Sequence, residues 1–156
     1  MGESDDVIML IIYLDNCCYN RPFDDLTLEK NHLEANAKLF IQSLIKYKSI
    51  ALIYSFMSLV EIEDSPFEDN KAYILSFVEA NATAFIGKKR LSEIEQLAND
   101  IMQTGIKKKD ATHLACAIVA GCDYFITTDK RLLRHKTDKI RIINPIDFVG
   151  IWRVLQ

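Results

Sequence analysis

Apolar and polar residues follow one another in blocks along the chain, and the spacing within each block distinguishes strands from helices. The run 7–14 is continuously apolar and rich in β-branched residues, which favours a central parallel strand covered on both faces. Shorter apolar runs predict strands over 49–54, 124–127 and 140–143, and residues 83–86 are also expected to be extended.

Between these runs, apolar residues recur at intervals of three and four, the spacing of one buried helical face. A first helix, which Thr27 can cap, is predicted with the buried face Leu33, Ala37, Phe40, Ile41, Leu44 and Ile45. Further helices are expected over 55–63, from 65–66 to about 80, from Ser92 to Gly105, over 108–120 and from Pro145 onward. Capping serines or asparagine open several of these helices, and glycines close two of them.

Strands therefore alternate with helices, which is typical of a mostly parallel α/β sheet between two helical layers. The 156 residues suffice for one domain with a full core and are too few for two of comfortable size. No repeat or linker divides the sequence. We expect a single domain over 1–156, with its core at about 7–150.

Composition adds few constraints. The chain is 49% hydrophobic and 26% charged, with a net charge of -3, so no global positive field indicates nucleic acid. A basic rim around an acidic site would give the same total, and basic residues do cluster at 88–90, 107–109 and 130–136.

Cellular location is suggested by the cysteines and by the start of the chain. The four cysteines form no C-x-x-C pair, so reduced thiols in a cytoplasmic protein are expected. The apolar run 7–14 is far shorter than the about 20 residues that span a bilayer. Its acidic leader has the wrong charge for a signal peptide, so no membrane association is expected.

Acidic residues occupy corresponding places in the predicted fold. Asp15 and Asp129 each follow an apolar strand, Asp110 lies where a helix begins, and Glu61 lies in the short helix after the second strand. The ends of parallel strands meet at one sheet edge, where ligands usually bind. Clustered carboxylates raise each other's pKa unless cations neutralise them, and such oxygen ligands suit Mg²⁺ or Mn²⁺.

A metal held by carboxylates can activate water and stabilise charge on a phosphoryl group, so the acidic set points to a metal-dependent nuclease. Each acid alone also has a simpler explanation. Asp110 can be a favourable helix-start residue, and Asp129 can cap a short helix over 130–134.

Four segments in order resemble the PIN domain family, over about residues 8 to 148. They are Ile12-Tyr13-Leu14-Asp15, Ser58-Leu59-Val60-Glu61-Ile62, Asp110-Ala111-Thr112-His113-Leu114-Ala115 and Phe125-Ile126-Thr127-Thr128-Asp129. The best-known members are the VapC-like toxin ribonucleases of bacterial toxin–antitoxin pairs. The resemblance implies a three-layer α/β/α fold with a five-stranded parallel sheet, and an acidic quartet that holds one or two divalent cations to hydrolyse RNA or single-stranded nucleic acid.

The resemblance also assigns residue roles. The metal-binding and catalytic acids would be Asp15, Glu61, Asp110 and Asp129, and Thr127 would help to order the site. The family usually has Ser or Thr directly after the first acid, where this chain has Asn16. The Asn16 amide could supply a hydrogen bond there.

Other residues are candidates on position alone. Arg21 and the run Lys107, Lys108 and Lys109 could contact substrate phosphates, or they could form a solvated surface. His113, one turn after Asp110, could touch the edge of the site, but such a histidine is more often a polar packing residue. Cys17 and Cys18 have no histidine in a recognisable catalytic pattern.

The sequence thus predicts an endoribonuclease dependent on Mg²⁺ or Mn²⁺, and by resemblance a toxin with a cognate antitoxin and a homodimer surface around Glu61 and Pro66. The alternative is a non-catalytic module that binds nucleic acid or protein, which Asn16 leaves open. A phosphotransfer domain with Asp15 as nucleophile is disfavoured, because Cys17 occupies the second position of the D-x-D pattern that such enzymes use.

Overall fold

The computed structural model describes residues 9–19 and 29–156. Its strands are β1 (Ile11–Leu14), β2 (Ala51–Ser55), β3 (Ala84–Ile86), β4 (Tyr124–Ile126) and β5 (Arg141–Ile143). Its helices are α1 (Glu29–Lys46), α2 (Phe56–Glu63), α3 (Glu68–Asn81), α4 (Leu91–Met102), α5 (Lys108–Val119), α6 (Lys130–Arg134) and α7 (Pro145–Leu155). Short 3₁₀ turns occur at Asn16–Cys18 and Lys88–Arg90.

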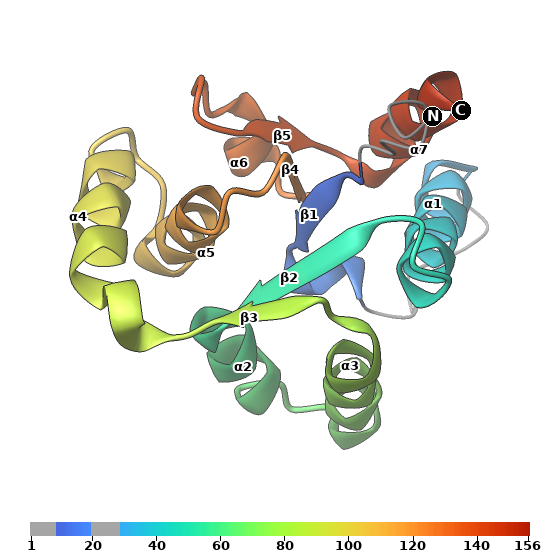
Figure 1. Cartoon of the computed structure of the whole chain (residues 1–156), viewed down its shortest axis with the longest axis horizontal. Coiled ribbons are helices and arrows are strands. Elements are labelled where there is room, and N and C mark those ends of the chain that lie inside the picture. The colour runs from blue at the N-terminus through green and yellow to red at the C-terminus, as the bar shows by residue number, and fades with distance from the viewer. Residues whose placement is uncertain (1–8, 20–28) are drawn as a thin grey trace, which may run out of the picture.

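The five strands form one sheet in the order β3-β2-β1-β4-β5, and every neighbouring pair is parallel (Figure 1). This confirms the predicted α/β fold with a five-stranded sheet between helices. In the register of the sheet, Tyr13 of β1 pairs with Ile53 of β2 on one side and Phe125 of β4 on the other.

Alternate residues of β1 enter two separate cores. Ile12 and Leu14 pack with side chains of α1, α3 and α7, whereas Tyr13 packs with side chains of α4 and α5. The helices accordingly cover both faces of the sheet, with α1 and α7 on one side and α4 and α5 on the other (Figure 1). A continuous apolar run is what a strand buried on both faces requires.

Helix ends agree with the sequence in several places. Asn144 caps α7 through its side chain and Pro145 opens the helix, while Gly121 follows α5 with φ +77. Asp129 caps α6, as its simpler explanation predicted. Such ends satisfy backbone groups that a helix leaves unpaired.

The structure corrects the predicted starts of α3 and α4. The prediction of a serine-capped helix from 65–66 is wrong at its start, because α3 begins at Glu68. The Ser65 hydroxyl accepts a hydrogen bond from the Phe67 amide, at 3.3 Å. Ser92 is not a cap either, since it lies inside α4, which follows directly on a 3₁₀ turn. The predicted cap Thr27 lies outside the described residues.

Leu33 was wrongly assigned to the buried face of α1. Its side chain is 50% exposed and borders a surface groove between α1 and α7, together with Phe40 and Ile146. The other positions of that face are buried or half-buried. Among the helices of the described residues, none combines the length and the apolar character needed to cross a membrane.

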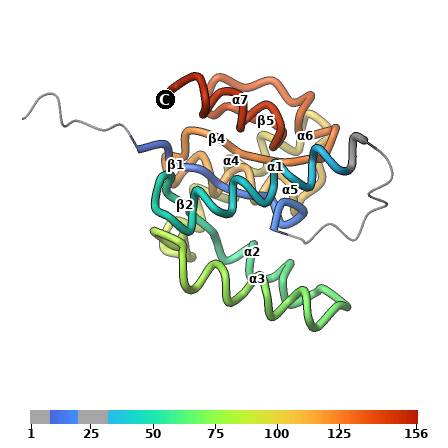
Figure 2. The backbone as a smooth tube through the Cα atoms, turned by 90° about the vertical axis from the view of Figure 1, so that its right-hand side faces the viewer, coloured from blue at the N-terminus to red at the C-terminus, as the bar shows by residue number. Residues whose placement is uncertain are grey.

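The order of the strands places a topological switch point at β1. From β1 the chain proceeds to β2 and β3 on one side, whereas β4 and β5 lie on the other side of β1. Ligands of open α/β sheets bind at such a switch point. In the view of Figure 2, α2 and α3 lie together at one end of the molecule, and α2 starts directly at the carboxyl end of β2.

Candidate metal centre

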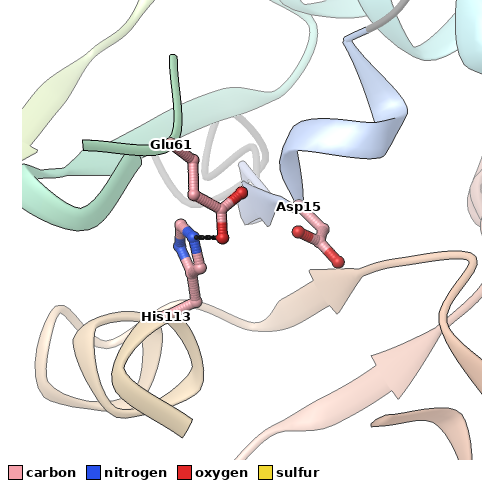
Figure 3. A group of neighbouring side chains, drawn as sticks. All are labelled: Asp15, Glu61 and His113. Carbon is pink, nitrogen blue, oxygen red and sulfur yellow. Dashed lines mark ion pairs between the residues drawn. The ribbon is translucent and has the colours of Figure 1, made fainter. Parts of the chain in front are cut away.

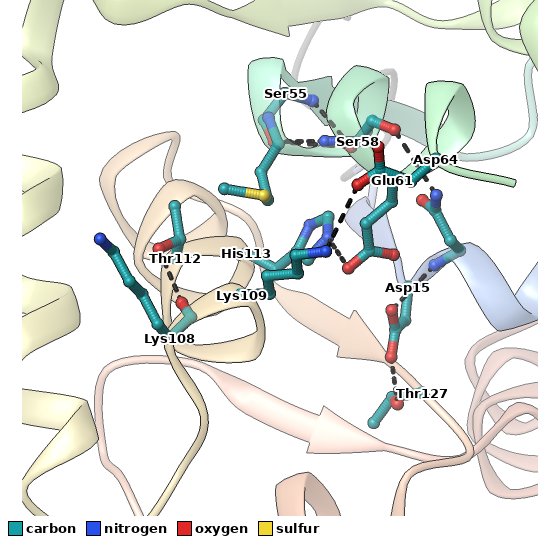
Figure 4. Close-up of polar contacts among 12 residues, drawn as sticks. Asp15, Ser55, Ser58, Glu61, Asp64, Lys108, Lys109, Thr112, His113 and Thr127 are labelled. Atoms are coloured by element: carbon teal, nitrogen blue, oxygen red, sulfur yellow. Dashed lines mark hydrogen bonds and ion pairs between the residues drawn. The ribbon is translucent and has the colours of Figure 1, made fainter.

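Asp15 lies at the carboxyl end of β1, beside β4, and its carboxylate is held from two sides. Its Oδ1 accepts a hydrogen bond from the Asn16 amide at 2.8 Å, and its Oδ2 accepts one from the Thr127 hydroxyl at 2.7 Å (Figure 4). The Thr127 hydroxyl in turn accepts a hydrogen bond from the Asp129 amide at 3.0 Å. Asp15 is only 8% exposed, so this carboxylate is buried and held in one orientation at the carboxyl edge of the sheet.

Glu61 and His113 complete a compact group around this carboxylate. Figure 3 shows the two side chains approaching Asp15 from α2 and α5. Nε2 of His113 lies 2.8 Å from Oε1 of Glu61. One potential ligand atom from each of the three residues lies within 4.8 Å of the others.

His113 thus belongs to this compact group, next to the two carboxylates. It is fully buried and lies three positions after Asp110, on the same side of α5. That spacing is the one signal in the sequence that links it to the acids.

A buried tyrosine supports His113 from behind. The Tyr13 hydroxyl lies 2.5 Å from Nδ1 of His113, 2.6 Å from the Ser55 hydroxyl and 3.1 Å from the Ser58 hydroxyl. Its ring stacks on Phe125 with centroids 5.4 Å apart. Burial raises the pKa of Tyr13 well above its ordinary value, so the side chain is a neutral phenol that connects β1, α2 and α5.

The acids share one electrostatic environment. Burial raises the pKa of Asp15, the Thr127 hydrogen bond and His113 oppose this, and Glu61 adds to it. Burial also raises the pKa of Asp110, and the charges of Asp15, Asp129 and Glu61 raise it further. The four predicted acids thus lie close enough to interact, although only two of them belong to the compact group with His113.

Asp110 and Asp129 are placed differently from the central pair. Asp110 is half-buried in the first turn of α5. Asp129 uses its Oδ1 to accept hydrogen bonds from the amides of Arg131 and Leu132, at 2.8 and 3.1 Å. Its other carboxylate oxygen accepts none of the hydrogen bonds found in the described part of the chain, so the capping of α6 leaves Oδ2 available.

The remaining predicted site residues have varied surroundings. The backbone amide of Asn16 donates a hydrogen bond to Asp15. Its side-chain Nδ2 lies 3.5 Å from the Ser58 carbonyl oxygen, a long hydrogen bond. Lys107, Lys108 and Lys109 are exposed at the start of α5, and Nζ of Lys109 lies 3.4 Å from Asp64. Arg21 lies outside the described residues.

None of the four cysteines takes part in a disulfide in the structure. Burial raises the pKa of Cys116 to about 11 and that of Cys122 to about 12, so both remain protonated near neutral pH. Cys17 accepts a hydrogen bond from the Thr128 hydroxyl at 3.2 Å. None of these contacts joins a cysteine to a histidine.

The donor set of the compact group fits a divalent cation. Two carboxylates and one imidazole face a common space, and Nε2 of His113 and Oδ1 of Asn16 are buried without a hydrogen bond among the described residues. Ligands on opposite sides of an ion at about 2.1 Å are separated by about 4.2 Å. The observed spread of the ligand atoms therefore needs only small side-chain shifts to close around an ion.

Comparisons with known proteins support the fold. No protein-family model and no curated protein matches the sequence. Among solved structures, the chain resembles VapBC2 from Rickettsia felis, crystallised with a DNA fragment from its promoter, with a TM-score of 0.58 and 16% identity over 86% of this chain and 98% of that one. It also resembles FitAcB from Neisseria gonorrhoeae, with a TM-score of 0.51 and 16% identity over 86% of this chain and 97% of that one.

Proposed function

We propose that this protein is a divalent-metal-dependent endoribonuclease and that Asp15 and Glu61 hold its cation. The observation that carries the proposal is the convergence of these two carboxylates and His113 within 4.8 Å, at the switch point of a parallel sheet. Burying carboxylates so close together is costly unless a cation compensates their charge. Asp110 and Asp129 border the same space and are suited to complete the shell or to hold a second cation.

The chain supplies the positioning that this chemistry needs. Thr127 and the Asn16 amide fix the two oxygens of Asp15, so its remaining lone pairs keep a constant direction. When bound, a divalent cation such as Mn²⁺ or Mg²⁺ lowers the pKa of water and stabilises charge on a phosphoryl group. Asp110 has a raised pKa and is the candidate that accepts a proton from the attacking water.

Substrate contacts are assigned to the basic start of α5. Lys107 and Lys108 are exposed beside Asp110 and can bind the phosphates on either side of the cleaved bond. Nζ of Lys109 lies 3.4 Å from Asp64, which follows α2, so it lies near the end of the helix that carries Glu61. RNA backbone phosphates attract such groups electrostatically regardless of sequence.

We further propose that the protein acts in a toxin–antitoxin pair. The support is structural likeness to VapBC2, which indicates the fold and makes a partner protein a reasonable expectation. The surface around Glu61 and Pro66 is the proposed contact surface for an antitoxin or a second copy of the chain. Val60 and Phe67 on that surface are 43% and 68% exposed, and large exposed apolar side chains are enriched where proteins bind each other.

The function is tested by substituting Glu61 and a matched glutamate. Glu61→Gln removes one ligand charge, whereas Glu79→Gln makes the same change at an exposed position of α3. Cleavage of a mixed RNA pool in Mn²⁺ is expected to fall by at least about 100-fold in Glu61→Gln, the scale of losing a catalytic electrostatic group. It should be unchanged in Glu79→Gln.

Equal cleavage by both variants would remove Glu61 from the site. Absence of cleavage by the folded wild-type protein, with RNA binding retained, would instead favour the non-catalytic binding module. In that case Asn16→Ser would be the first variant to examine, because the hydroxyl it introduces is the group that the resemblance expects beside Asp15.

A further inference from the structure

His113 is placed as a nitrogen donor to the site. Its side chain is fully buried, and its Nδ1 lies 2.5 Å from the Tyr13 hydroxyl. On the other side of the ring, Nε2 faces the carboxylate of Glu61 (Figure 4). Nε2 approaches Glu61 to 2.8 Å, yet it makes no hydrogen bond with adequate geometry in the described part of the chain. A buried ring nitrogen beside two carboxylates and without a hydrogen bond is expected where a cation binds.

We propose that Nε2 of His113 is the third protein ligand of the cation, so that the site selects a first-row transition-metal ion of the Mn²⁺ type over Mg²⁺. This inference rests on the proposed function and specifies its metal. It adds a ligand that the acidic quartet predicted from the sequence does not contain.

The hydrogen bonds behind His113 are able to hold the required tautomer. The Ser55 hydroxyl oxygen accepts hydrogen bonds from two backbone amides, those of Met57 and Ser58. Both of its lone pairs are thereby used, so its own hydrogen is left to donate to Tyr13 at 2.6 Å.

Tyr13 then has one hydrogen to donate and two candidate acceptors. The Ser58 hydroxyl oxygen lies 3.1 Å away and can accept it. With that bond formed, the Tyr13 oxygen accepts the Nδ1–H of His113, and the lone pair of the neutral imidazole resides on Nε2. Metal-bound histidines usually donate their second ring N–H in this way, which fixes the ring and increases its basicity.

The mixed donor set determines the class of metal. Mg²⁺ binds oxygen ligands almost exclusively and retains several waters, whereas imidazole is a good ligand for later first-row ions. One imidazole with the carboxylates of Asp15 and Glu61 is thus better matched to a first-row transition-metal ion than to Mg²⁺. Mn²⁺ is the member of that series that also prefers carboxylate ligands, so it is the ion used as the probe. The simpler alternative is that His113 only pairs electrostatically with Glu61 and never contacts a metal.

Pulsed EPR of Mn²⁺ bound to the full chain distinguishes these possibilities, because a coordinated imidazole couples its nitrogen nucleus to the metal electrons. We expect a ¹⁴N coupling that is replaced by a ¹⁵N coupling when the protein is grown with ¹⁵N-labelled histidine. The measurement uses the unsubstituted protein, so it does not depend on a variant that folds poorly.

Variants assign the coupling to one residue. A double variant, His32→Gln with His135→Gln, leaves only His113 and should retain the signal. His113→Gln should lose the signal and weaken Mn²⁺ binding by about 10- to 100-fold or more, since even outer-shell partners of a metal site have effects of that size. Mg²⁺ affinity, measured by competition, should change less.

Mn²⁺ bound without nitrogen coupling, together with unchanged affinity in His113→Gln, would overturn this inference. RNA cleavage that depends on Asp15 under the same conditions would leave the proposed nuclease intact. Failure of the wild-type protein to bind Mn²⁺ would overturn the metal centre itself and this inference with it.

Discussion

Removing the Tyr13 hydroxyl is expected to destabilise the protein far more than removing a hydroxyl at another buried tyrosine. The Tyr13 hydroxyl is the shared partner of Ser55, Ser58 and Nδ1 of His113. In Tyr13→Phe, stacking on Phe125 is retained because the ring is unchanged, so the loss is entirely polar.

The magnitude follows from what each partner retains. The Ser55 and Ser58 hydroxyls keep their hydrogen bonds to backbone amides, so each loses only the net value of one hydrogen bond, about 0.5 to 1.5 kcal/mol at most. Nδ1 of His113 retains no other hydrogen bond in the described chain, and such an unsatisfied buried group costs about 1 to 3 kcal/mol. We expect the free energy of unfolding to fall by about 2 to 6 kcal/mol.

Urea denaturation in EDTA at neutral pH measures this loss, with an unchanged m-value if the unfolded state is unaffected. Tyr124→Phe is the matched control, because its hydroxyl accepts a single hydrogen bond, from Arg141 at 3.1 Å, and should lose about 1 kcal/mol or less. A loss below about 0.5 kcal/mol in Tyr13→Phe, or a loss equal to that of the control, would refute the shared-partner explanation.

Three further predictions concern other parts of the fold. Folding raises the pKa of Asp110, so the folded state binds its proton more tightly than the unfolded chain does. The stability of the metal-free wild type relative to Asp110→Asn should therefore fall as pH rises from about 4 toward 7. A difference in urea midpoints that stays flat or rises over this range would contradict the prediction. Thr127→Val removes the hydroxyl that donates to Asp15 and should cost about 1.5 to 3 kcal/mol in urea denaturation, whereas Thr127→Ser should recover most of it. Gly121→Ala should lower the melting temperature, because a residue with a side chain at φ +77 is destabilised by about 1 to 2 kcal/mol. Gly150→Ala inside α7 should raise the melting temperature by the equivalent of about 0.5 to 1 kcal/mol, because an added Cβ there meets nothing within 4 Å.

The order of strands and helices was predictable because it depends on local patterns. The unbroken apolar character of β1 placed Ile12, Tyr13 and Leu14 in a strand with two buried faces, and the structure divides them between two cores. The stop at Gly121 was equally local, since the left-handed backbone there favours glycine.

Helix starts were less predictable, because Ser, Pro and Glu can also form a turn that precedes a helix. Ser65 has the spacing of a capping box and yet supports only the bend before α3. Ser55 forms such a box with Ser58 as its second member, a pair that lacks the usual glutamate. Leu33 followed the helical period but lies over a surface groove, because periodicity does not show how far the neighbouring helix extends.

Asp15 and Asp129 became candidates from their places after strands, and Asp110 from its place at a helix start. The groups that contact them could not be selected in this way. Tyr13 meets its partners across 42 residues to Ser55 and 100 residues to His113, and no local pattern encodes such contacts. The only sequence feature that linked His113 to the acids was its position three residues after Asp110. The contacts around His113 therefore emerge at the tertiary level, where distant segments pack together.

The most direct test of the central claim is the metal dependence of RNA cleavage by the purified protein, with Asp15→Ala measured in parallel. Cleavage is expected with Mn²⁺, loss of cleavage with EDTA and recovery when Mn²⁺ is restored. The Asp15→Ala protein, shown by circular dichroism to be folded, should be inactive throughout. Cleavage that persists in EDTA, or that Asp15→Ala retains in full, would contradict a cation held by Asp15 as the basis of the activity.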